Sequence, residues 1–516
     1  MNARTAIVVL VALVLVSTPS GAASPTWSVA TQVSTPDRAL VPELATNPAG
    51  DALAVWDQEV GSVCPTDPAA LACVHIVTAA TRMHGAGGWS APLEIRRPGI
   101  GSRPRAGIDP NGNAAILLVH DIGADRVVQA SFRRGFGGQW PEPNDLSESV
   151  HEVRAHDVAL DASGNVVAAW AERTDTGVVI EAESRDAASG VWGAPVRLSH
   201  GGNVTGGPAL AVTPAGEAVA AWVEDGTVRV ASGQAASGSW NGAVVIPASD
   251  PATGDPDLAV NPAGDGVVVW SASGSVRAAF RPHGSGWSAA ATVAPLSGAP
   301  DAHARVGIDA AGNAVAVWVA GSVRSAARMR TAGTWSATVA LTAAGASEPD
   351  VAVNPAGDAV AVWVGATTHW LRSGLRPAAS GIWRRKVNLS LGPNATSPRV
   401  AIDAGGNAVA LWDRNPAGTA IGVESAELRA SGPFLAQLVI PPQPRAGVSS
   451  LYSVTPIRWT APLVGKPTWR FGDGKTVSAF RVTRAYARAG RYTVTISATD
   501  AAGGTSTTGA TVVVQP

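Results

Sequence analysis

The sequence has 516 residues, with 38 lysine and arginine residues against 39 aspartate and glutamate residues, for a formal net charge of −1. This length is too great for one ordinary hydrophobic core and suits a large repeat domain followed by a small one. Because the charges balance, they give no basis for binding nucleic acid or an anionic membrane surface, and we expect neither as a partner.

The N-terminal residues have the pattern of a secretory signal peptide. Arg4 precedes an apolar stretch over residues 6–16, and small residues follow at 21–23. A basic start, a short apolar run and a small-residue end are typical of an export signal, and the run is too short to span a bilayer. We predict a signal peptide over residues 1–23, with a buried N-terminal strand as the alternative. No later stretch has the roughly 20 apolar residues of a membrane helix, so we expect a secreted monomer without a membrane span.

A short phrase that recurs eight times dominates the rest of the sequence. In residues 305–318 it reads RVGIDAAGNAVAVW, an apolar start, a polar turn with glycine, and an apolar run that ends in tryptophan. The other copies occupy residues 43–56, 105–119, 157–170, 209–222, 257–270, 350–363 and 399–412. The intervals between their glycines run from 45 residues (Gly312 to Gly357) to 62 residues (Gly50 to Gly112). A period near 50 residues fits four short strands and their turns, which is one blade of a β-propeller. We predict an all-β protein with a propeller of about eight blades over residues 24–440, with seven blades as the alternative.

The longest interval contains both cysteines, Cys64 and Cys73, and indicates an insertion. Outside the cell, a close pair of this kind most simply forms a disulfide that closes a short loop. A metal site needs more ligands, and adding the nearby His75 still leaves the set incomplete, so we expect no metal. We predict a disulfide between these two residues.

The sixth copy illustrates the expected strands, at residues 305–308, 314–318, 323–328 and 335–341. Between the first two, Asp309 is expected to cap the turn through backbone amides, and Gly312 to adopt the left-handed conformation of a hairpin with a bulge. A calcium loop is the alternative, but the alternating oxygen ligands and the distant bidentate glutamate are missing.

The second strand of each copy is apolar at every position, as in a strand that is buried on both faces. Its recurring tryptophan is therefore expected to lie in the core between blades, at Trp56, Trp170, Trp222, Trp270, Trp318, Trp363 and Trp412, with Val119 in the second copy. A second tryptophan series, at Trp89, Trp140, Trp192, Trp240, Trp287, Trp335 and Trp383, begins the outer strands. We expect it to pack over the blade edge, with sugar stacking as the alternative. Trp27 or Phe434 is expected to pair with the first or last blade and close the ring.

The repeat resembles NHL and related propeller repeats, whose first hairpin has a similar hydrophobic–Asp–x–x–Gly–Asn–hydrophobic form. The resemblance covers about residues 25–440, and many unrelated propellers use the same hairpin. Sialidase Asp-boxes have the order Ser-x-Asp-x-Gly-x-x-Trp, which these copies do not match.

A proline-rich segment at residues 441–445 is predicted to be a stiff linker, after which the repeat stops. The following stretch, 446–516, resembles the immunoglobulin-like PKD domain. The matching positions are Trp469, Phe471, Gly472, Asp473, Gly474, Tyr486, Gly490, Tyr492, Val494 and Asp500. In this interpretation the Gly-Asp-Gly turn needs positive φ angles, and Trp469 and Tyr492 fill a two-sheet core. The resemblance implies a spacer, or a contact to polysaccharide or protein, in an extracellular setting.

The sequence has no phosphate-binding loop, no nucleophile elbow and no zinc-protease motif. We therefore predict no catalytic residue and no cofactor. One candidate remains, a set of acidic residues after the second strand at Asp57, Asp121, Glu172, Glu224 and Asp413. If equivalent strand ends lie on one rim, these carboxylates form a binding ring at the channel mouth. The alternative is that strand ends are polar because they face water.

The leading hypothesis is a secreted, non-catalytic binding or scaffolding protein. Its propeller loop face would bind extracellular polysaccharide or protein, and the PKD-like domain would act as a spacer or a second contact. The competing class is a secreted carbohydrate-active hydrolase or lyase that uses carboxylates at the channel mouth, and a purely structural surface protein comes third.

Overall fold

The computed structural model describes residues 25–35, 38–60, 74–99, 103–121, 125–148, 152–175, 177–296, 302–415 and 422–516. These residues contain no helix. Two compact units are distinguished, one of residues 27–429 and one that includes residues 430–516. The predicted signal peptide and the predicted disulfide between Cys64 and Cys73 lie outside the described residues.

The first unit is a β-propeller, as predicted. Within the described residues it has eight antiparallel sheets of four or five strands that follow one another in chain order. The first four consist of β3 (Ala39–Thr46), β4 (Ala52–Val60), β5 (Val74–Arg82) and β6 (Leu93–Gly99); β7 (Arg105–Ile108), β8 (Ala114–Asp121), β9 (Arg126–Arg133) and β10 (Asn144–Asp145); β11 (Glu152–Leu160), β12 (Val166–Thr174), β13 (Gly177–Arg185) and β14 (Val196–Arg197); and β15 (Ala209–Val212), β16 (Glu217–Glu224), β17 (Thr227–Gln234), β18 (Ser239–Trp240) and β19 (Val244–Val245).

The remaining four sheets follow the same order. They consist of β20 (Asp257–Val260), β21 (Gly266–Ala272), β22 (Ser275–Arg281) and β23 (Ala291–Pro295); β24 (Arg305–Ile308), β25 (Ala314–Val319), β26 (Val323–Arg328) and β27 (Val339–Ala340); β28 (Ser347–Val353), β29 (Ala359–Val364), β30 (Leu371–Arg376) and β31 (Arg384–Asn388); and β32 (Ala395–Ile402), β33 (Ala408–Arg414) and β34 (Gly422–Arg429), joined by β1 (Thr26–Trp27) and β2 (Thr31–Gln32).

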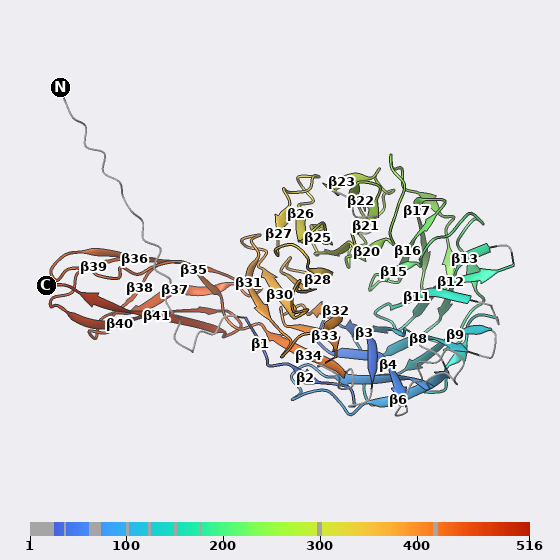
Figure 1. The fold of residues 1–516 in the computed structure, drawn as a ribbon, viewed down its shortest axis with the longest axis horizontal. Coiled ribbons are helices and arrows are strands. Elements are labelled where there is room, and N and C mark those ends of the chain that lie inside the picture. The colour runs from blue at the N-terminus through green and yellow to red at the C-terminus, as the bar shows by residue number, and fades with distance from the viewer. Residues whose placement is uncertain are drawn as a thin grey trace, which may run out of the picture. The chain divides into compact units, whose positions relative to one another are not determined.

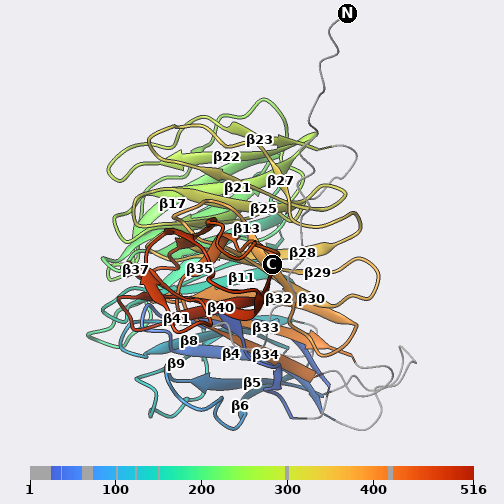
Figure 2. The same cartoon turned by 90° about the vertical axis from the view of Figure 1, so that its left-hand side faces the viewer.

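The first strand of each sheet is the innermost one. These strands contact one another from sheet to sheet, and β3 of the first sheet contacts β32 of the last, so the ring is closed. The blue first sheet and the orange last sheet lie side by side in both ribbon views (Figures 1 and 2).

The N-terminal strands complete the last sheet. Both β1 and β2 pair with β34, and the amide of Ser28 donates a hydrogen bond of 2.7 Å to the carbonyl of Glu427. Of the two residues proposed for ring closure, Trp27 is therefore the one in the propeller. Phe434 lies in the other unit, where its ring packs edge-on against Trp459 at 6.0 Å.

The turn chemistry read from the sequence is confirmed in the sixth sheet. Oδ1 of Asp309 accepts hydrogen bonds from the amides of Ala311 and Asn313 at 2.9 and 2.8 Å, and Gly312 has a φ of 80°. The carboxylate is thus consumed by the turn, which agrees with a capping role and not with calcium binding.

Both tryptophan series lie where the packing argument placed them. The seven second-strand tryptophans are at most 1% exposed, and the outer series is half-buried against the clusters between sheets. One assignment was wrong: Leu118, which is fully buried, occupies the tryptophan position of the second sheet. Val119 is the next residue and points away from that core, because neighbouring residues of a strand face opposite sides.

The second unit is a two-sheet sandwich. One sheet has the order β35 (Phe434–Val439), β36 (Ser450–Ile457) and β39 (Arg481–Arg484), and the other has the order β38 (Thr476–Ser478), β37 (Leu463–Arg470), β40 (Gly490–Asp500) and β41 (Thr505–Val514). The turn glycines Gly472 and Gly474 have φ angles of 75° and 87°, as expected. Trp469 is buried, but Tyr492 is only half-buried. The fully buried tyrosines are Tyr452 and Tyr486, and the hydroxyl of Tyr486 donates to the carbonyl of Phe471 at 3.0 Å.

The boundary between the units lies earlier than residue 440, and the proline-rich segment is not a free linker. Strand β35 pairs with β36, which places residues 434–439 in the sandwich. The carbonyls of Pro442 and Pro444 accept hydrogen bonds from the amides of Val513 and Gln515. Proline cannot donate to a ladder but its carbonyl can accept, so the segment forms an edge of this sheet.

Candidate functional site

One position in the innermost strand of each propeller sheet carries a charge that alternates in sign around the ring. At this position the residue pairs with the one before the core tryptophan, as Arg305 pairs with Val317 and Asp257 with Val269. In chain order the eight residues are Glu43, Arg105, Asp157, Ala209, Asp257, Arg305, Asp350 and Arg399. We call them the charge ring. Odd-numbered sheets contribute an acid and even-numbered sheets an arginine, except that the fourth sheet contributes an alanine.

Glu43 connects three sheets of the charge ring. Its Oε2 accepts hydrogen bonds from Nη1 of Arg105 in the second sheet at 2.6 Å and from Nε of Arg399 in the last sheet at 3.1 Å. Burial alone would raise the pKa of Glu43, but the positive charges of Arg399 and Arg105 hold it below its ordinary value. Glu43 is therefore ionised at neutral pH, and it links the first and last sheets where the ring closes.

The three aspartates of the charge ring bind the backbone of the sheet that follows. Each Oδ2 accepts a hydrogen bond from the amide one residue beyond the next ring position: Asp157 from Leu210 at 2.9 Å, Asp257 from Val306 at 2.7 Å and Asp350 from Val400 at 2.8 Å. These bonds cross between sheets, so the acid of an odd-numbered sheet holds the even-numbered sheet after it.

The alternation is broken at the fourth sheet, where Ala209 takes the place of an arginine. Burial raises the pKa of both flanking acids, Asp157 and Asp257, to about 6, and the charges of Arg105 and Arg305 oppose this rise only in part. The break leaves each of these two acids with a ring arginine in only one neighbouring sheet, and it removes the bulk of one long side chain from the channel.

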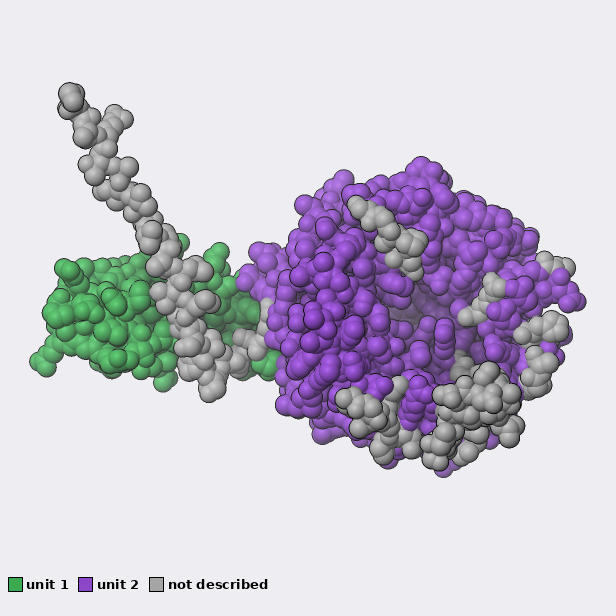
Figure 3. Space-filling view, viewed as in Figure 1, with its two compact units in different colours: residues 1–26, 430–516 green, residues 27–429 purple. Residues whose placement is uncertain are grey.

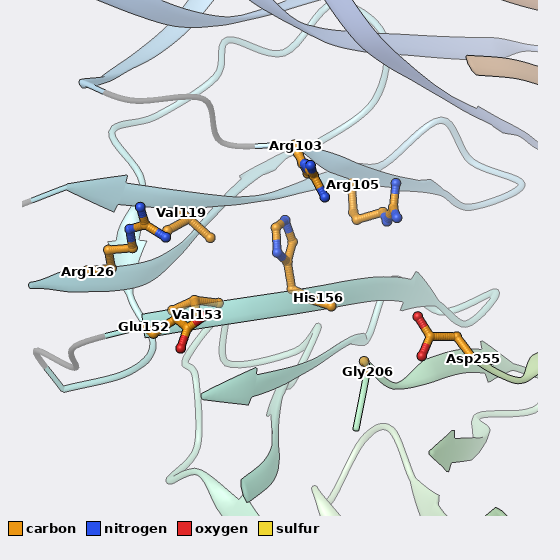
Figure 4. Close-up of a pocket in the computed structure, with 11 residues that line it drawn as sticks. Arg103, Arg105, Val119, Arg126, Glu152, Val153, His156, Gly206 and Asp255 are labelled. Carbon is orange, nitrogen blue, oxygen red and sulfur yellow. The ribbon is translucent and has the colours of Figure 1, made fainter. Parts of the chain in front are cut away.

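A cavity of about 510 Å³ lies at this break. Its walls come from the second and third sheets, from the loop that leads into β15 and from the loop that leads into β20. Figure 4 shows Arg103 and Arg105 on one side of the cavity and His156 on the facing strand, β11. Asp255 lies beside Gly206. Figure 3 shows a hollow in the face of the propeller unit.

Small residues make room for the cavity. A Cβ atom on Gly206 would clash with the carboxylate of Asp255, and one on Gly207 would clash with the Cβ of Ala155. Gly207 precedes Ala209 by two residues, at a place where the second sheet has Arg103 and the seventh has Glu348. The fourth sheet is therefore small at both channel-facing positions.

His156 is the most unusual side chain of the cavity. Six of the other sheets have a proline directly before the charge-ring residue, and the sixth sheet has Ala304. His156 is 7% exposed, and its Nε2 has no hydrogen-bond partner among the described residues. Burial and the positive charge of Arg105 lower its pKa to about 3. A neutral imidazole thus lines the cavity, and its unpartnered Nε2 atom is buried.

Three arginines line the same space, and they differ in their partners. Arg105 is paired with Glu43 at 2.6 Å, and Arg126 with Asp121 at 3.1 Å. Arg103 is exposed, and within the described part of the chain its guanidinium has no ion-pair partner. Two acids also line the cavity, Glu152, which accepts from Arg173 at 2.9 Å, and Asp255. Among the described residues, the guanidinium of Arg103 is therefore the one in the cavity wall without an ion-pair partner, and it lies near the neutral imidazole of His156.

The acidic residues predicted to form a rim all lie near the end of a second strand, but at different positions. Asp57 and Asp413 directly follow the core tryptophan, whereas Glu172 and Glu224 follow it by two residues. Because side chains alternate along a strand, the two pairs face opposite sides of their sheets.

Each of these carboxylates already has a partner in the propeller. The contacts are Asp57 to Nδ1 of His75 at 3.0 Å, Asp121 to Arg126 at 3.1 Å, Glu172 to Nε1 of Trp170 at 2.7 Å, Glu224 to the amides of His200 and Gly202 at 2.9 Å, and Asp413 to the amide of Val41 at 3.2 Å. All but Asp121 are at most 6% exposed. The structure does not gather the five around one ligand space, and Asp121 alone reaches the cavity, through Arg126.

Sequence reasoning missed the charge ring and His156, although both are visible in the sequence. Each charge-ring residue is the fourth residue before the Asp, Asn or Thr that opens the turn of its copy. The alternation of charge becomes visible when this position is compared across all eight copies of the repeat. In any single copy a charged residue at the start of a strand is unremarkable, so the pattern appears only in the comparison.

Two further observations concern metals and membranes. Among the described residues, no group of three or more His, Cys, Asp or Glu side chains is arranged to hold a metal ion. The same residues include no helix that is long and apolar enough to cross a bilayer.

Comparison with known proteins identifies the C-terminal unit. Residues 464–515 match the PKD domain family. No curated protein matches this sequence. Among solved structures, the chain is similar to Sqt1 of Saccharomyces cerevisiae, with 10% identity, 78% of this chain and 98% of that chain covered, and a TM-score of 0.49. It is also similar to the NanB sialidase of Streptococcus pneumoniae, with 13% identity, coverage of 78% and 70%, and a TM-score of 0.34. A protein of unknown function from Dyadobacter fermentans has 10% identity, coverage of 78% and 98%, and a TM-score of 0.37.

Proposed function

We propose that this is an extracellular, non-catalytic binding protein. Its propeller holds a polysaccharide or protein ligand at the mouth of the central channel, and the PKD domain serves as a spacer or a second contact. The observation that carries the proposal is the cavity at the break in the charge ring, which is lined by the exposed Arg103 and the buried His156. Its volume of about 510 Å³ lies within the range of roughly 300–1,000 Å³ that is typical of ligand pockets.

The arrangement of the cavity favours ligand binding because its polar side chains lie on neighbouring sheets of the propeller, which hold them in fixed positions. The guanidiniums of Arg105 and Arg126 are held by ion pairs, so they are preorganised. The PKD domain supports an extracellular setting, since such domains are typical of extracellular proteins.

A hydrolase or lyase is the second candidate, and one observation keeps it in view. Glu152 and Asp255 both line the cavity, and a pair of carboxyl groups is the usual equipment for cleaving a glycosidic bond. Ligand turnover separates this candidate from simple binding.

The test is a glycan array and an array of extracellular matrix proteins, each probed with the full chain and read beside a reducing-end release assay. We expect retention of a ligand without release. A Val119→Trp variant, which fills the cavity wall, should lose binding, whereas Val191→Trp, on an outer loop where the side chain is 64% exposed, should keep it. Equal binding by both variants would place the ligand elsewhere, and release of reducing ends would favour the hydrolase.

A further inference from the structure

We infer that an exposed basic surface of the sandwich binds an anionic polysaccharide, a polymer that carries sulfate or carboxylate groups along its chain. The surface consists of five exposed cations at and beside one end of the sandwich, and we call it the basic surface: Arg445, Arg470, Lys475, Arg488 and Arg491. Such binding goes beyond the proposed function, because it gives the sandwich a ligand class of its own and does not depend on the propeller cavity.

The near-zero net charge of the chain is the sum of two units with opposite charge. Residues 430–516 contain nine arginine and lysine residues and two aspartates, for a formal charge of +7. Residues 27–429 contain 28 arginine and lysine residues and 37 acidic residues, for a formal charge of −9. The balance of the whole chain therefore conceals a strongly basic sandwich, and a strongly basic domain attracts polyanions.

The pairing of the strands brings three of the cations to one end of the sandwich, which carries the label C in Figure 1. Arg491 lies at the start of β40, opposite the end of β41. Arg445 forms a bridge with Gln515, just beyond β41, so both cations flank the end of that strand. The carbonyl of Arg488 accepts a hydrogen bond of 3.1 Å from the hydroxyl of Tyr492, which holds the loop before β40 at the same end.

The Gly-Asp-Gly turn brings Lys475 to this end as well. A Cβ atom on Gly472 would clash with the backbone of Thr493, so the turn lies directly against the first half of β40. The amide of Lys475 donates a hydrogen bond of 3.2 Å to Oδ1 of Asp473. Lys475 is therefore fixed to the turn by its backbone, while its side chain is exposed.

The outer face of the four-stranded sheet connects the fifth cation with the others. Arg491, Thr493 and Thr495 alternate along β40 with residues of the core, so their side chains share the outer face. Arg470 of β37 pairs with Thr495 and lies on the same face. Threonine hydroxyls, which both donate and accept hydrogen bonds, thus lie between two guanidiniums. Cations beside neutral hydroxyl groups match a polymer that carries both acidic groups and hydroxyls.

The acidic side chains of the sandwich do not neutralise the basic surface. Asp473 forms an ion pair with Arg484, which is not one of the five cations. Asp500 is 4% exposed, and at the other end of β40 it accepts hydrogen bonds from the amides of Ala502 and Gly504. Residues 430–516 have no other acidic side chain. The five cations therefore keep their charge available for a ligand.

The spread of the five cations favours a polymer over a small anion. They come from two loops, one turn and two strands, and neighbouring strands of a sheet lie about 4.8 Å apart. One small anion cannot contact all of them. A chain with a charge on successive units can contact several at once, and linked contacts strengthen one another.

The aromatic rings of the sandwich favour a polysaccharide over single-stranded nucleic acid, whose bases stack on exposed rings. Tyr452, Phe471 and Tyr486 are at most 1% exposed. Tyr492 packs against Tyr486 with 4.3 Å between the ring centroids. Phe480 is exposed, but it precedes β39, whose last residue and not its first lies at the basic surface. The basic surface therefore offers charges and hydroxyls, and no free ring for a base.

The experiment is calorimetric titration of the full chain with three polymers that share one backbone: dextran sulfate, carboxymethyl dextran and unmodified dextran. We expect a charged dextran to bind at least about tenfold more tightly than unmodified dextran. Its affinity should fall at least about tenfold between roughly 50 and 200 mM salt, because binding releases counterions. The more tightly bound of the two charged polymers identifies the acidic group.

A triple variant tests the surface itself. Arg445→Gln, Arg488→Gln and Arg491→Gln together should weaken binding of the charged dextran about 10- to 100-fold, because three exposed charge contacts are lost. All three side chains are exposed, so the variant should keep the thermal midpoint of the native chain to within a few degrees.

The matched control removes the same charge from other places on the sandwich. Arg458→Gln, Lys466→Gln and Arg481→Gln change three exposed cations outside the basic surface. This variant should bind the charged dextran within about threefold of the native affinity, because exposed charges farther away than the Debye length are screened. Val119→Trp, in the wall of the propeller cavity, should also bind it like the native chain.

Equal affinity for charged and unmodified dextran, or equal losses in the two triple variants, would overturn the inference. Tighter binding of a DNA duplex with the same number of charges would replace the polysaccharide by nucleic acid. If the native chain sediments as a dimer at low salt and the basic-surface variant as a monomer, the surface binds the acidic propeller of a second copy instead.

Failure of this inference differs from failure of the proposed function. A chain that retains an array ligand but does not bind the charged dextrans would overturn the inference and leave the proposed function standing. If a charged dextran binds but Val119→Trp loses no array ligand, the inference stands and the role proposed for the cavity fails.

Discussion

Replacing Asp257 by asparagine should change how the stability of the propeller depends on pH. Asp257 lies in the charge ring next to the break, and burial raises its pKa to about 6 from an ordinary 3.8. A carboxyl group whose pKa is higher in the folded state binds more protons when folded, so stability rises as pH falls through the window between about 6 and 4. Asp257→Asn removes this titration but keeps an oxygen for the amide of Val306.

The size of the effect follows from the two pKa values. Between pH 7.5 and pH 5, the native chain should gain about 1.4 kcal/mol of unfolding free energy from Asp257. The variant lacks this gain. The difference in unfolding free energy between the variant and the native chain should therefore change by about 1.4 kcal/mol, in favour of the native chain, from pH 7.5 to pH 5. Charged neighbours, including Arg305, Asp350, Arg399 and the oppositely shifted Glu43, are present in both proteins and cancel in the difference.

The assay is guanidinium unfolding at both pH values, followed by tryptophan fluorescence. Asp257→Ala serves as a companion variant, because it removes the charge together with the hydrogen bond to Val306. It should show the same flattened pH profile as Asp257→Asn but be less stable at both pH values by about 1 kcal/mol. A native-like pH profile in Asp257→Asn would refute the reasoning that burial, and not hydrogen bonding, governs this group.

Two further predictions concern the ring and the domain boundary. Ala209→Arg should restore the alternation of charge and raise the unfolding free energy at pH 7.5 by about 1 kcal/mol, as measured by denaturation. It should also weaken ligand binding at the cavity, as measured by titration. A destabilised variant would contradict the role given to the break. Phe434→Ala should destabilise the sandwich by about 3–5 kcal/mol without shifting the propeller transition, because Phe434 is 7% exposed and packs on Trp459. A shift of the propeller transition in a two-step melt would argue against assigning β35 to the sandwich.

Much of the fold could be predicted because the sequence features that determine it act over short range and recur in every copy of the repeat. The turn from Asp309 to Asn313 uses short-range hydrogen bonds that residue types alone indicate. The apolar second strand needs cover on both faces, and only a ring or stack of repeats supplies it. The same logic located both tryptophan series and the turn of the sandwich.

The errors have equally physical causes. The boundary predicted at residue 440 is wrong because proline ends many repeats, whereas the carbonyls of Pro442 and Pro444 here accept hydrogen bonds from the last strand of the sandwich. Val119 is wrong as the tryptophan equivalent because the six-residue spacing from the turn glycine, counted from Gly112, leads to Leu118.

The cavity was beyond prediction for a different reason. It depends on side chains from separate sheets, such as Arg103, His156 and Gly207, that approach only when the ring closes. The acidic residues at the strand ends drew attention because they are charged, yet a buried carboxylate such as Glu224 is occupied by nearby backbone amides. The sequence shows where carboxylates occur, but only the folded structure shows which of them already accept hydrogen bonds.

The alternating charges also bear on how the propeller can change in evolution. Acids on odd sheets and arginines on even sheets agree around a closed circle only when the number of sheets is even. Away from the break at Ala209, gain or loss of a single repeat would set two like charges side by side, whereas gain or loss of two neighbouring repeats would preserve every match. The innermost strands therefore favour changes of this ring by pairs of sheets.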